Sequence, residues 1–265
     1  MVPTATIVIL IINAIIGFVL PVVLVWWLVK KHKASIVTVL IGAATFFIFA
    51  LVLESMVHAV VLKGRSGEAI QGNILYYAIY GGLMAGLFEE TGRFLSMKFL
   101  MKKEPSETLP AIAYGAGHGG IEVILVFAFS MISSLVMALM INAGQADALL
   151  AKVPAEAQAQ LEEQLAQFQT TTPASLLLGI WERISALVLH LSLSVLVWAA
   201  VRKAGKWSWL FPAAILLHAL VDGVTVILSK GGVGNVAIEF FIMAMAIAIA
   251  AIAWMVAHKA FRKAE

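Results

Sequence analysis

Long apolar stretches alternate with short polar connections along the whole chain. Windows of about 20 or more apolar residues recur at about 5–29, 36–62, 74–100, 110–140, 175–201, 208–229 and 236–258, and about 20 residues suffice for a helix to cross a bilayer. The pattern predicts an all-α polytopic membrane protein with about seven transmembrane helices in one domain over residues 1–265. The first stretch lacks the flanks of a signal peptide, so we expect it to remain a span.

Composition and charge agree with this pattern and predict an orientation. Hydrophobic residues make up 62% of the chain and charged residues 12%, which excludes an ordinary soluble domain. Lys and Arg follow the first, third, fifth and seventh stretches, at positions 30, 31, 33, 98, 102, 103, 202, 203, 206, 259, 262 and 263. The positive-inside rule then places the N-terminus outside and the C-terminus in the cytoplasm. This asymmetry accounts for the net positive charge, so the charge gives no evidence for binding of nucleic acid. We expect a multi-pass plasma-membrane protein embedded in the lipid bilayer.

One connection, residues 142–173, is long and rich in Ala, Gln and Glu. Leu161, Leu165 and Phe168 fall on one face at helical spacing, so we expect a short amphipathic helix in this extracytoplasmic loop. Such a helix is either a solvated connector or a lid that docks substrate.

Three charged residues interrupt the third apolar stretch: Glu89, Glu90 and Arg93. A charge near the bilayer centre costs roughly 2.5–3.5 kcal/mol, so such residues pair, bind a ligand or take part in chemistry. Counting about 1.5 Å of rise per residue from the cytoplasmic helix ends places three histidines at a similar depth. They are His118, His190 and His218. Four spans thus predict one polar layer in the cytoplasmic half of the membrane.

Carboxylates recur at helical spacing from these residues. The pairs that lie four residues apart, and so share a helix face, are His118 with Glu122, His218 with Asp222, Glu89 with Arg93, and Glu54 with His58. Glu182 lies two turns before His190 on nearly the same face. We expect a main site supported by Arg93, Glu122, Glu182, His190 and Asp222, with Glu54 and His58 in a separate polar layer above it.

Glu182 and Arg183 are adjacent and therefore point about 100° apart on their helix. We expect Glu182 to face the bundle interior and Arg183 to find an acceptor other than Glu182. We also expect Glu89 or Glu90, His118 and His218 to surround one water-accessible cavity, with their side chains within roughly 3–7 Å of one another.

Carboxylates and histidines in this arrangement suit the activation of water. Glu89 or Glu90 would act as general base, while His118 and His218 position the water or stabilise an oxyanion. Alternatively, three neutral imidazoles, those of His118, His190 and His218, would hold zinc with an open position. The sequence favours the version without a cofactor and leaves zinc possible. A proton- or metal-coupled transporter using the same cluster is the rival class.

Other protease chemistries are excluded by the residues present. The chain contains no His-Glu-x-x-His motif and no Gly-x-Ser-x-Gly motif, and its lack of Cys excludes a thiol nucleophile. An aspartyl dyad needs two membrane aspartates, whereas this chain has only Asp147 and Asp222, and Asp147 lies in the long loop. A hydrolase of this sequence must therefore use glutamate and histidine.

Three short runs resemble a known family. Glu-Glu-Thr-Gly-Arg at 89–93, Gly-His-Gly-Gly-Ile-Glu at 117–122 and His-Ala-Leu-Val-Asp at 218–222 look like the YhfC family of intramembrane proteases. That family is related to the group that contains PrsW and the CAAX-processing and bacteriocin-immunity proteins. The resemblance covers roughly residues 50–225.

This resemblance implies a bacterial intramembrane endopeptidase acting on membrane-embedded or membrane-proximal proteins or peptides. Glu89 would be the catalytic base, Glu90 and Arg93 its supports, and His118 and His218 the residues that bind water or metal. Asp222 stands where the CAAX-processing relatives carry Asn, which leaves the oxyanion-stabilising residue open.

Overall fold

The predicted apolar stretches form long helices in the computed structural model, which describes residues 1–145 and 172–261 together with Ala151, Pro154, Gln158, Glu162 and Phe168. The elements are α1 (Thr4–Lys31), α2 (Ile36–Phe46), η1 (Phe47–Glu54), α3 (Ser55–Val61), α4 (Arg65–Gln71), α5 (Ile74–Phe99), α6 (Thr108–Glu122), η2 (Val123–Ala128), α7 (Phe129–Asn142), α10 (Pro173–Lys203), η3 (Gly205–Trp207), α11 (Leu210–Lys230) and α12 (Asn235–Phe261). These described elements are all helical, which confirms the predicted fold class. The amphipathic helix expected within 142–173 falls mostly outside the described residues, including Leu161 and Leu165 of its predicted apolar face.

Helix starts follow local capping chemistry. The side chain of Ser35 accepts a hydrogen bond from the Thr38 backbone at the start of α2, and Asn73 accepts from two backbone N–H groups at the start of α5. Thr172 caps α10, whose first residue is Pro173. These side chains satisfy N–H groups that have no partner inside the helix.

Six helical segments of the described chain are long and apolar enough to cross a membrane: Thr4–Lys31, Ile36–Val61, Thr108–Asn142, Pro173–Lys203, Gly205–Lys230 and Asn235–Phe261. Two of them include a π-helical stretch, η1 or η2, between α-helices. α5 is a further helix of 26 residues, and the charged run of Glu89, Glu90 and Arg93 makes it less apolar than these six segments. Together they agree with the prediction of about seven spans.

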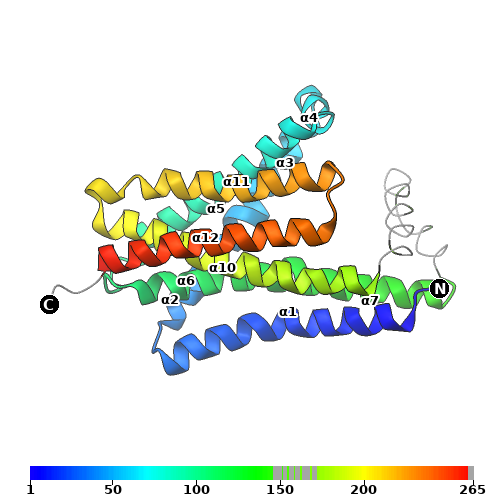
Figure 1. The fold of residues 1–265 in the computed structure, drawn as a ribbon, viewed down its shortest axis with the longest axis horizontal. Coiled ribbons are helices and arrows are strands. Elements are labelled where there is room, and N and C mark those ends of the chain that lie inside the picture. The colour runs from blue at the N-terminus through cyan, green and yellow to red at the C-terminus, as the bar shows by residue number, and fades with distance from the viewer. Residues whose placement is uncertain are drawn as a thin grey trace.

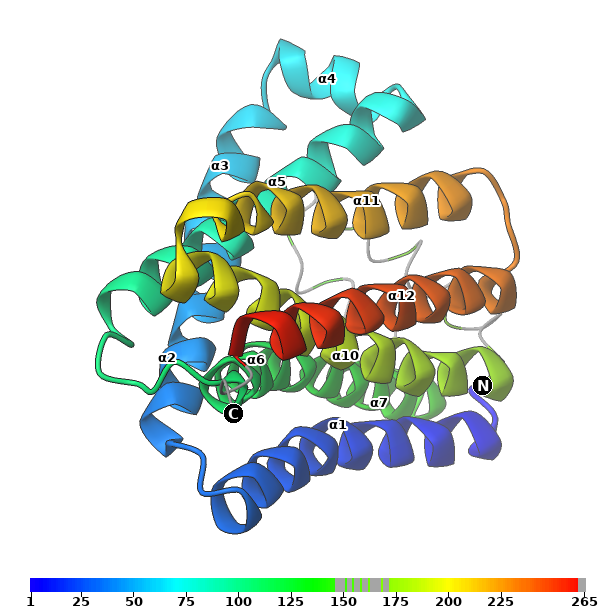
Figure 2. The same ribbon diagram turned by 60° about the vertical axis from the view of Figure 1, so that its left-hand side comes forward.

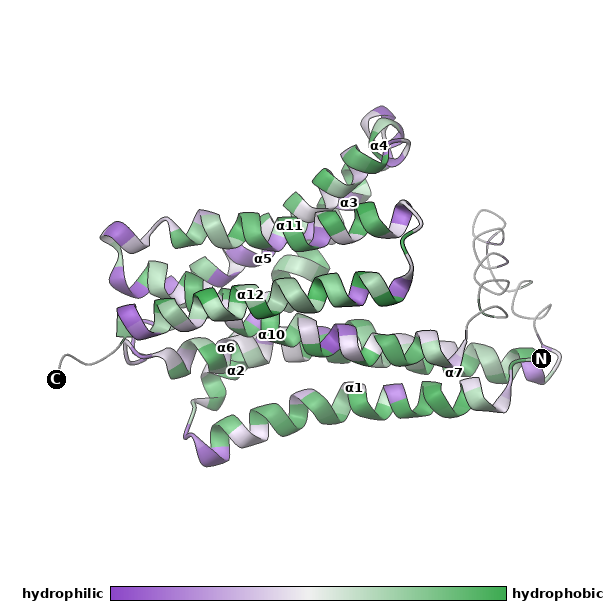
Figure 3. Cartoon of the chain, in the orientation of Figure 1, coloured by the Kyte–Doolittle hydropathy of each residue, from purple (hydrophilic) through white to green (hydrophobic). Residues whose placement is uncertain are grey.

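α10 is the central helix of the bundle. Its second half is almost entirely buried, and Trp198, Leu193 and Leu196 are fully enclosed. α5 and α11 pack side by side on one side of it, α12 packs along it, and α1 lies on the opposite side (Figures 1 and 2). Colouring by hydropathy shows mostly hydrophobic helices with hydrophilic residues at many helix ends (Figure 3). Polar residues on α10 are therefore placed where several helices meet.

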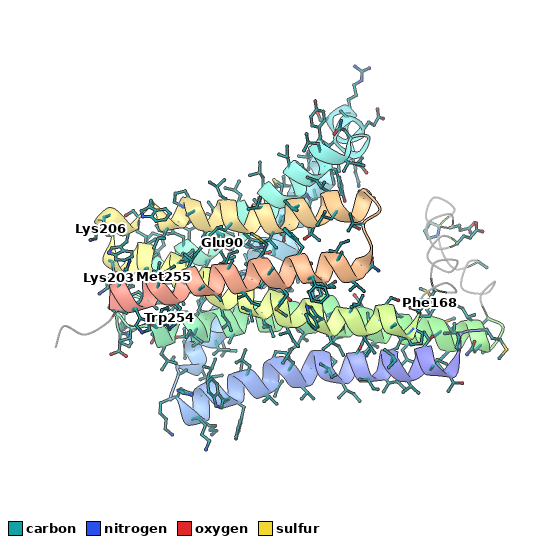
Figure 4. The ribbon with its side chains drawn as sticks, in the orientation of Figure 1. Glu90, Phe168, Lys203, Lys206, Trp254 and Met255 are labelled. Carbon is teal, nitrogen blue, oxygen red and sulfur yellow. The ribbon has the colours of Figure 1, made fainter. Side chains whose placement is uncertain are left out.

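The helix ends rich in Lys and Arg gather at one end of the bundle. Arg202, near the end of α10, donates to the backbone carbonyls of Lys102 and Glu104 in the connection after α5. Figure 4 shows Lys203 and Lys206 at this end and Glu90 well inside the bundle. The grouping matches the predicted charge asymmetry. The side of the membrane on which this end lies remains a prediction.

Candidate active site

Adjacent glutamates on α5 face two different neighbours. Successive residues of a helix point about 100° apart, so Glu89 meets α6 and α10 while Glu90 meets α11. We call Glu89, His118 and His190 the Glu89 group, and Glu90, Arg93 and His218 the Glu90 group. All six residues are buried.

The Glu89 group brings one carboxylate and two imidazoles together. Glu89 Oε2 lies 2.9 Å from His118 Nε2 and 3.8 Å from His190 Nδ1. The two imidazole rings are 5.1 Å apart between centroids. His118 Nδ1 is buried without a hydrogen-bond partner among the described residues. Within the described part of the chain, His118 Nδ1 is therefore left available to bind a ligand or a water molecule.

Contacts on both ring nitrogens define the tautomer of His190. Arg93 Nη2 donates to His190 Nδ1 at 3.2 Å, and because a guanidinium can only donate, Nδ1 must carry a lone pair. The hydrogen is then on Nε2, which lies 2.5 Å from Glu122 Oε2. Glu122 in turn accepts a 3.0 Å hydrogen bond from Arg183. The carboxylate behind Nε2 is the usual support of a metal-binding histidine. Nδ1 could bind an ion once Arg93 Nη2 gave up its hydrogen bond there, and the guanidinium would keep its bonds to the His190 carbonyl and to Ser194.

The Glu90 group is internally paired. Arg93 Nε lies 3.3 Å from Glu90 Oε2, and the guanidinium also donates to the His190 carbonyl and to Ser194 Oγ. Glu90 Oε1 lies 2.9 Å from His218 Nδ1. Glu90 therefore has a formal counter-charge and a hydrogen-bond partner inside the bundle.

His218 connects the Glu90 group to a more accessible residue. Its Nε2 lies 3.5 Å from Asp222 Oδ2, and the Asp222 side chain is 39% exposed. The ring of His218 is 5.5 Å from that of His190 between centroids. The pair of His218 and Asp222 that was predicted from their spacing is present. Through the ring of His218 it lies beside His190 of the Glu89 group.

Glycines on α6 let the histidine of α10 approach. A Cβ at Gly119 would lie 3.1 Å from His190 Cβ, and one at Gly115 would lie 2.8 Å from Ser194 Oγ. Small residues permit such close helix packing in membranes. The glycines around His118 thus help to bring His118 and His190 into one site.

A separate polar chain lies on η1, α3 and α5. His58 Nε2 is 3.1 Å from Glu54 Oε1, which confirms the pair expected from spacing. His58 Nδ1 is 2.8 Å from the hydroxyl of Tyr80. Sequence reasoning missed Tyr80, although a tyrosine inside an apolar helix, two turns from its start, was an available signal. We call Tyr80, His58 and Glu54 the tyrosine chain.

Two pairings predicted from helical spacing are met only in part. Arg93 has the spacing to share a helix face with Glu89, but the carboxylate it neutralises is that of Glu90, three residues away. The prediction that Arg183 finds an acceptor other than Glu182 is confirmed by its hydrogen bond to Glu122, but Arg183 also bonds to its neighbour Glu182, through its Nε at 2.8 Å and through Nη2. Both side chains are long and flexible enough to bend toward each other although their Cβ atoms diverge.

The metal-binding candidates also differ from those expected. Glu89, His118 and His190 each offer one ligand atom, and these atoms lie within 4.8 Å of one another. The expected trio contained His218 in place of Glu89. In the structure, both ring nitrogens of His218 face carboxylates, those of Glu90 and Asp222. Two histidines and one glutamate form the ligand set of a known class of catalytic zinc sites, so the residues present fit the ion.

Comparisons with known proteins identify the family of the chain. Residues 16–257 match the profile of a family described as YhfC intramembrane metalloprotease. The chain is 40% identical over 262 residues, 98% of its own length and 98% of the relative's, to a protein of Bacillus subtilis (strain 168) called uncharacterized membrane protein YhfC. No solved structure matches the chain. With its six apolar helices, the chain is a multi-pass bacterial membrane protein.

Proposed function

The chain belongs to the YhfC family, and on this premise we propose that it is a metal-dependent intramembrane endopeptidase whose ion is held by Glu89, His118 and His190. The observation that carries the proposal is the meeting of these three ligand atoms within 4.8 Å. Zinc held by this set would polarise a carbonyl group and lower the pKa of a bound water. The substrate class is a membrane-embedded or membrane-proximal peptide segment.

Charge supports a cation in the Glu89 group. The guanidinium of Arg93 forms its ion pair with Glu90, and Arg183 forms ion pairs with Glu122 and Glu182. The partners of Glu89 are two imidazoles, which are neutral when they act as ligands. Among the described residues Glu89 has no fixed counter-charge. A buried carboxylate in this state is costly, and a divalent ion would remove that cost.

We assign proton transfer to His218. Its Nδ1 is held by the buried carboxylate of Glu90, which stabilises the imidazolium form and leaves Nε2 to react. His218 Nε2 takes one proton from the attacking water and gives it to the nitrogen of the leaving amine. Asp222, at 3.5 Å, orients Nε2 from the accessible side. The second proton of the water stays on the new carboxylic acid.

The test is to measure metal content and cleavage on the same preparation. We expect the detergent-purified chain to carry about one zinc per molecule and to cleave members of a library of transmembrane peptides, with loss of both after chelation. His118→Ala should lose the metal, whereas His218→Ala should keep it and lose turnover. Cleavage that persists in a metal-free preparation would instead support Glu89 as a general base without a cofactor. Ion or proton flux in proteoliposomes without peptide cleavage would support the transporter.

A further inference from the structure

The tyrosine chain is a continuous hydrogen-bonded path between an enclosed carboxylate and a partly exposed ring. The Glu54 side chain is 11% exposed, whereas that of His58 is 31% exposed. His58 uses both ring nitrogens, one toward Glu54 Oε1 at 3.1 Å and one toward the Tyr80 hydroxyl at 2.8 Å. Imidazole is the side chain that can accept a proton on one nitrogen and release one from the other near neutral pH.

The inner end of this chain lies beside the candidate active site. Glu54 ends the π-helix η1, which packs against α5, and π-helical segments occur frequently at functional sites. Its carboxyl is close enough to interact electrostatically with Glu89 on α5 and with His218 and Asp222 on α11. Its outer groups are His58 on α3 and Tyr80 in the first half of α5, the two helices that lead toward α4 (Figure 1). The chain therefore runs from the site toward one end of the molecule.

The proposed reaction leaves a proton on the product acid inside the enclosed active site. Hydrolysis adds the two hydrogens of water to the products, one to the amine nitrogen through His218 and one on the new carboxylic acid. The acid ionises at neutral pH, so its proton must leave an enclosed site before the next turnover. Membrane proteins carry such protons along chains of carboxyl and imidazole groups.

We propose that Glu54, His58 and Tyr80 carry this proton out of the site, an inference that rests on the proposed peptidase function. The product acid gives its proton, through water or Asp222, to the Glu54 carboxylate. Glu54 passes it to His58 Nε2, and the imidazolium releases the proton on Nδ1 to the Tyr80 oxygen as the hydroxyl gives its own hydrogen to water. Each group gains one proton and loses one, so the net charge of the chain is unchanged. The hydrogen of His58 has moved from Nδ1 to Nε2, and exchange with water must return it to Nδ1 before the next transfer.

The experiment compares three variants with the zinc-loaded full-length enzyme in detergent. His58→Ala removes the central carrier, Glu54→Gln keeps the size of the side chain but not its proton affinity, and Tyr80→Phe removes only the hydroxyl. Steady-state cleavage gives kcat and KM, and thermal unfolding reports on packing. Imidazole is then added to each variant and to the parent enzyme, because His58 is exposed enough for a free imidazole to occupy the space of the deleted ring.

We expect kcat to fall about tenfold in His58→Ala and Glu54→Gln with KM and unfolding temperature unchanged, and imidazole to restore only His58→Ala. In Tyr80→Phe, kcat should fall by a smaller factor, since His58 can also release its proton to water. Unchanged kcat in both His58→Ala and Glu54→Gln would overturn the relay. A fall that imidazole does not restore, together with a lower unfolding temperature, would also overturn it and make the chain a brace between α3 and α5. Failure of the proposed function is distinct, because the parent enzyme would then cleave nothing, and the relay would fall with it.

Discussion

The Glu89 group and the Glu90 group begin from neighbouring residues of one helix and have opposite character. Glu90 has a completely buried side chain, an ion pair with Arg93 and a hydrogen bond with His218. Glu89 is 10% exposed at its side chain and contacts only imidazole groups among the interactions described for it. One carboxylate is neutralised by the protein, and the other is surrounded by groups that can themselves serve as ligands.

This difference separates support from chemistry within a single turn of α5. A buried ion pair with additional hydrogen bonds fixes geometry but has little capacity left to bind a ligand. A carboxylate between two imidazoles retains that capacity. The comparison therefore assigns structural consequences to changes in Glu90 and Arg93 and chemical consequences to changes in the Glu89 group, while His218, which Glu90 holds, has the separate role of proton transfer.

The largest effect is expected from Glu89→Gln. The amide keeps the size of the side chain but neither binds a cation well nor accepts a proton, so turnover should fall by about 10²- to 10⁴-fold. The unfolding temperature should stay within the error of the parent. Peptide cleavage and thermal unfolding measure the two quantities, with Glu68→Gln, an exposed position in the first turn of α4, as the matched control. Retention of parental turnover would contradict the assignment of chemistry to Glu89.

Arg93→Met should act on stability first. It leaves Glu90 buried without its counter-charge and removes donors to the His190 carbonyl and to Ser194, which should destabilise the fold by about 3–5 kcal/mol. Denaturant titration in mixed micelles would measure the loss.

A double variant sharpens this prediction. Glu90→Gln combined with Arg93→Met removes both charges, so it should recover part of the lost stability. If the double variant is as unstable as the sum of the two single variants, the Glu90 group is not a coupled pair.

The smallest effect is expected one contact away from the Glu89 group. Glu122→Gln weakens the acceptor behind His190 Nε2, so metal affinity should fall by about 10- to 100-fold with the fold retained. Competition with a fluorescent chelator measures the affinity. Lys203→Gln, at the far end of α10, is a control that should leave it unchanged. An affinity equal to that of the parent would mean that His190 is not a ligand.

The sequence by itself determined the membrane class, the helices and the set of residues to suspect. Apolar stretches must be helical in a bilayer because no water satisfies the backbone there, and charges at that depth are too costly to be incidental. Spacing along one helix also predicted His58 with Glu54 and His218 with Asp222, since residues four apart share a face.

Only the tertiary structure decided which partner each group takes. Whether Arg93 pairs with Glu89 or Glu90 depends on where α10 and α11 approach α5, and both carboxylates are within reach along the helix. The exchange of His218 for Glu89 in the metal-binding set, and the contact of Tyr80 with His58, depend in the same way on the rotation of one helix against another. Helix packing fixes that rotation through close contacts such as that of Gly119 with His190, and such contacts join residues that are distant in the sequence.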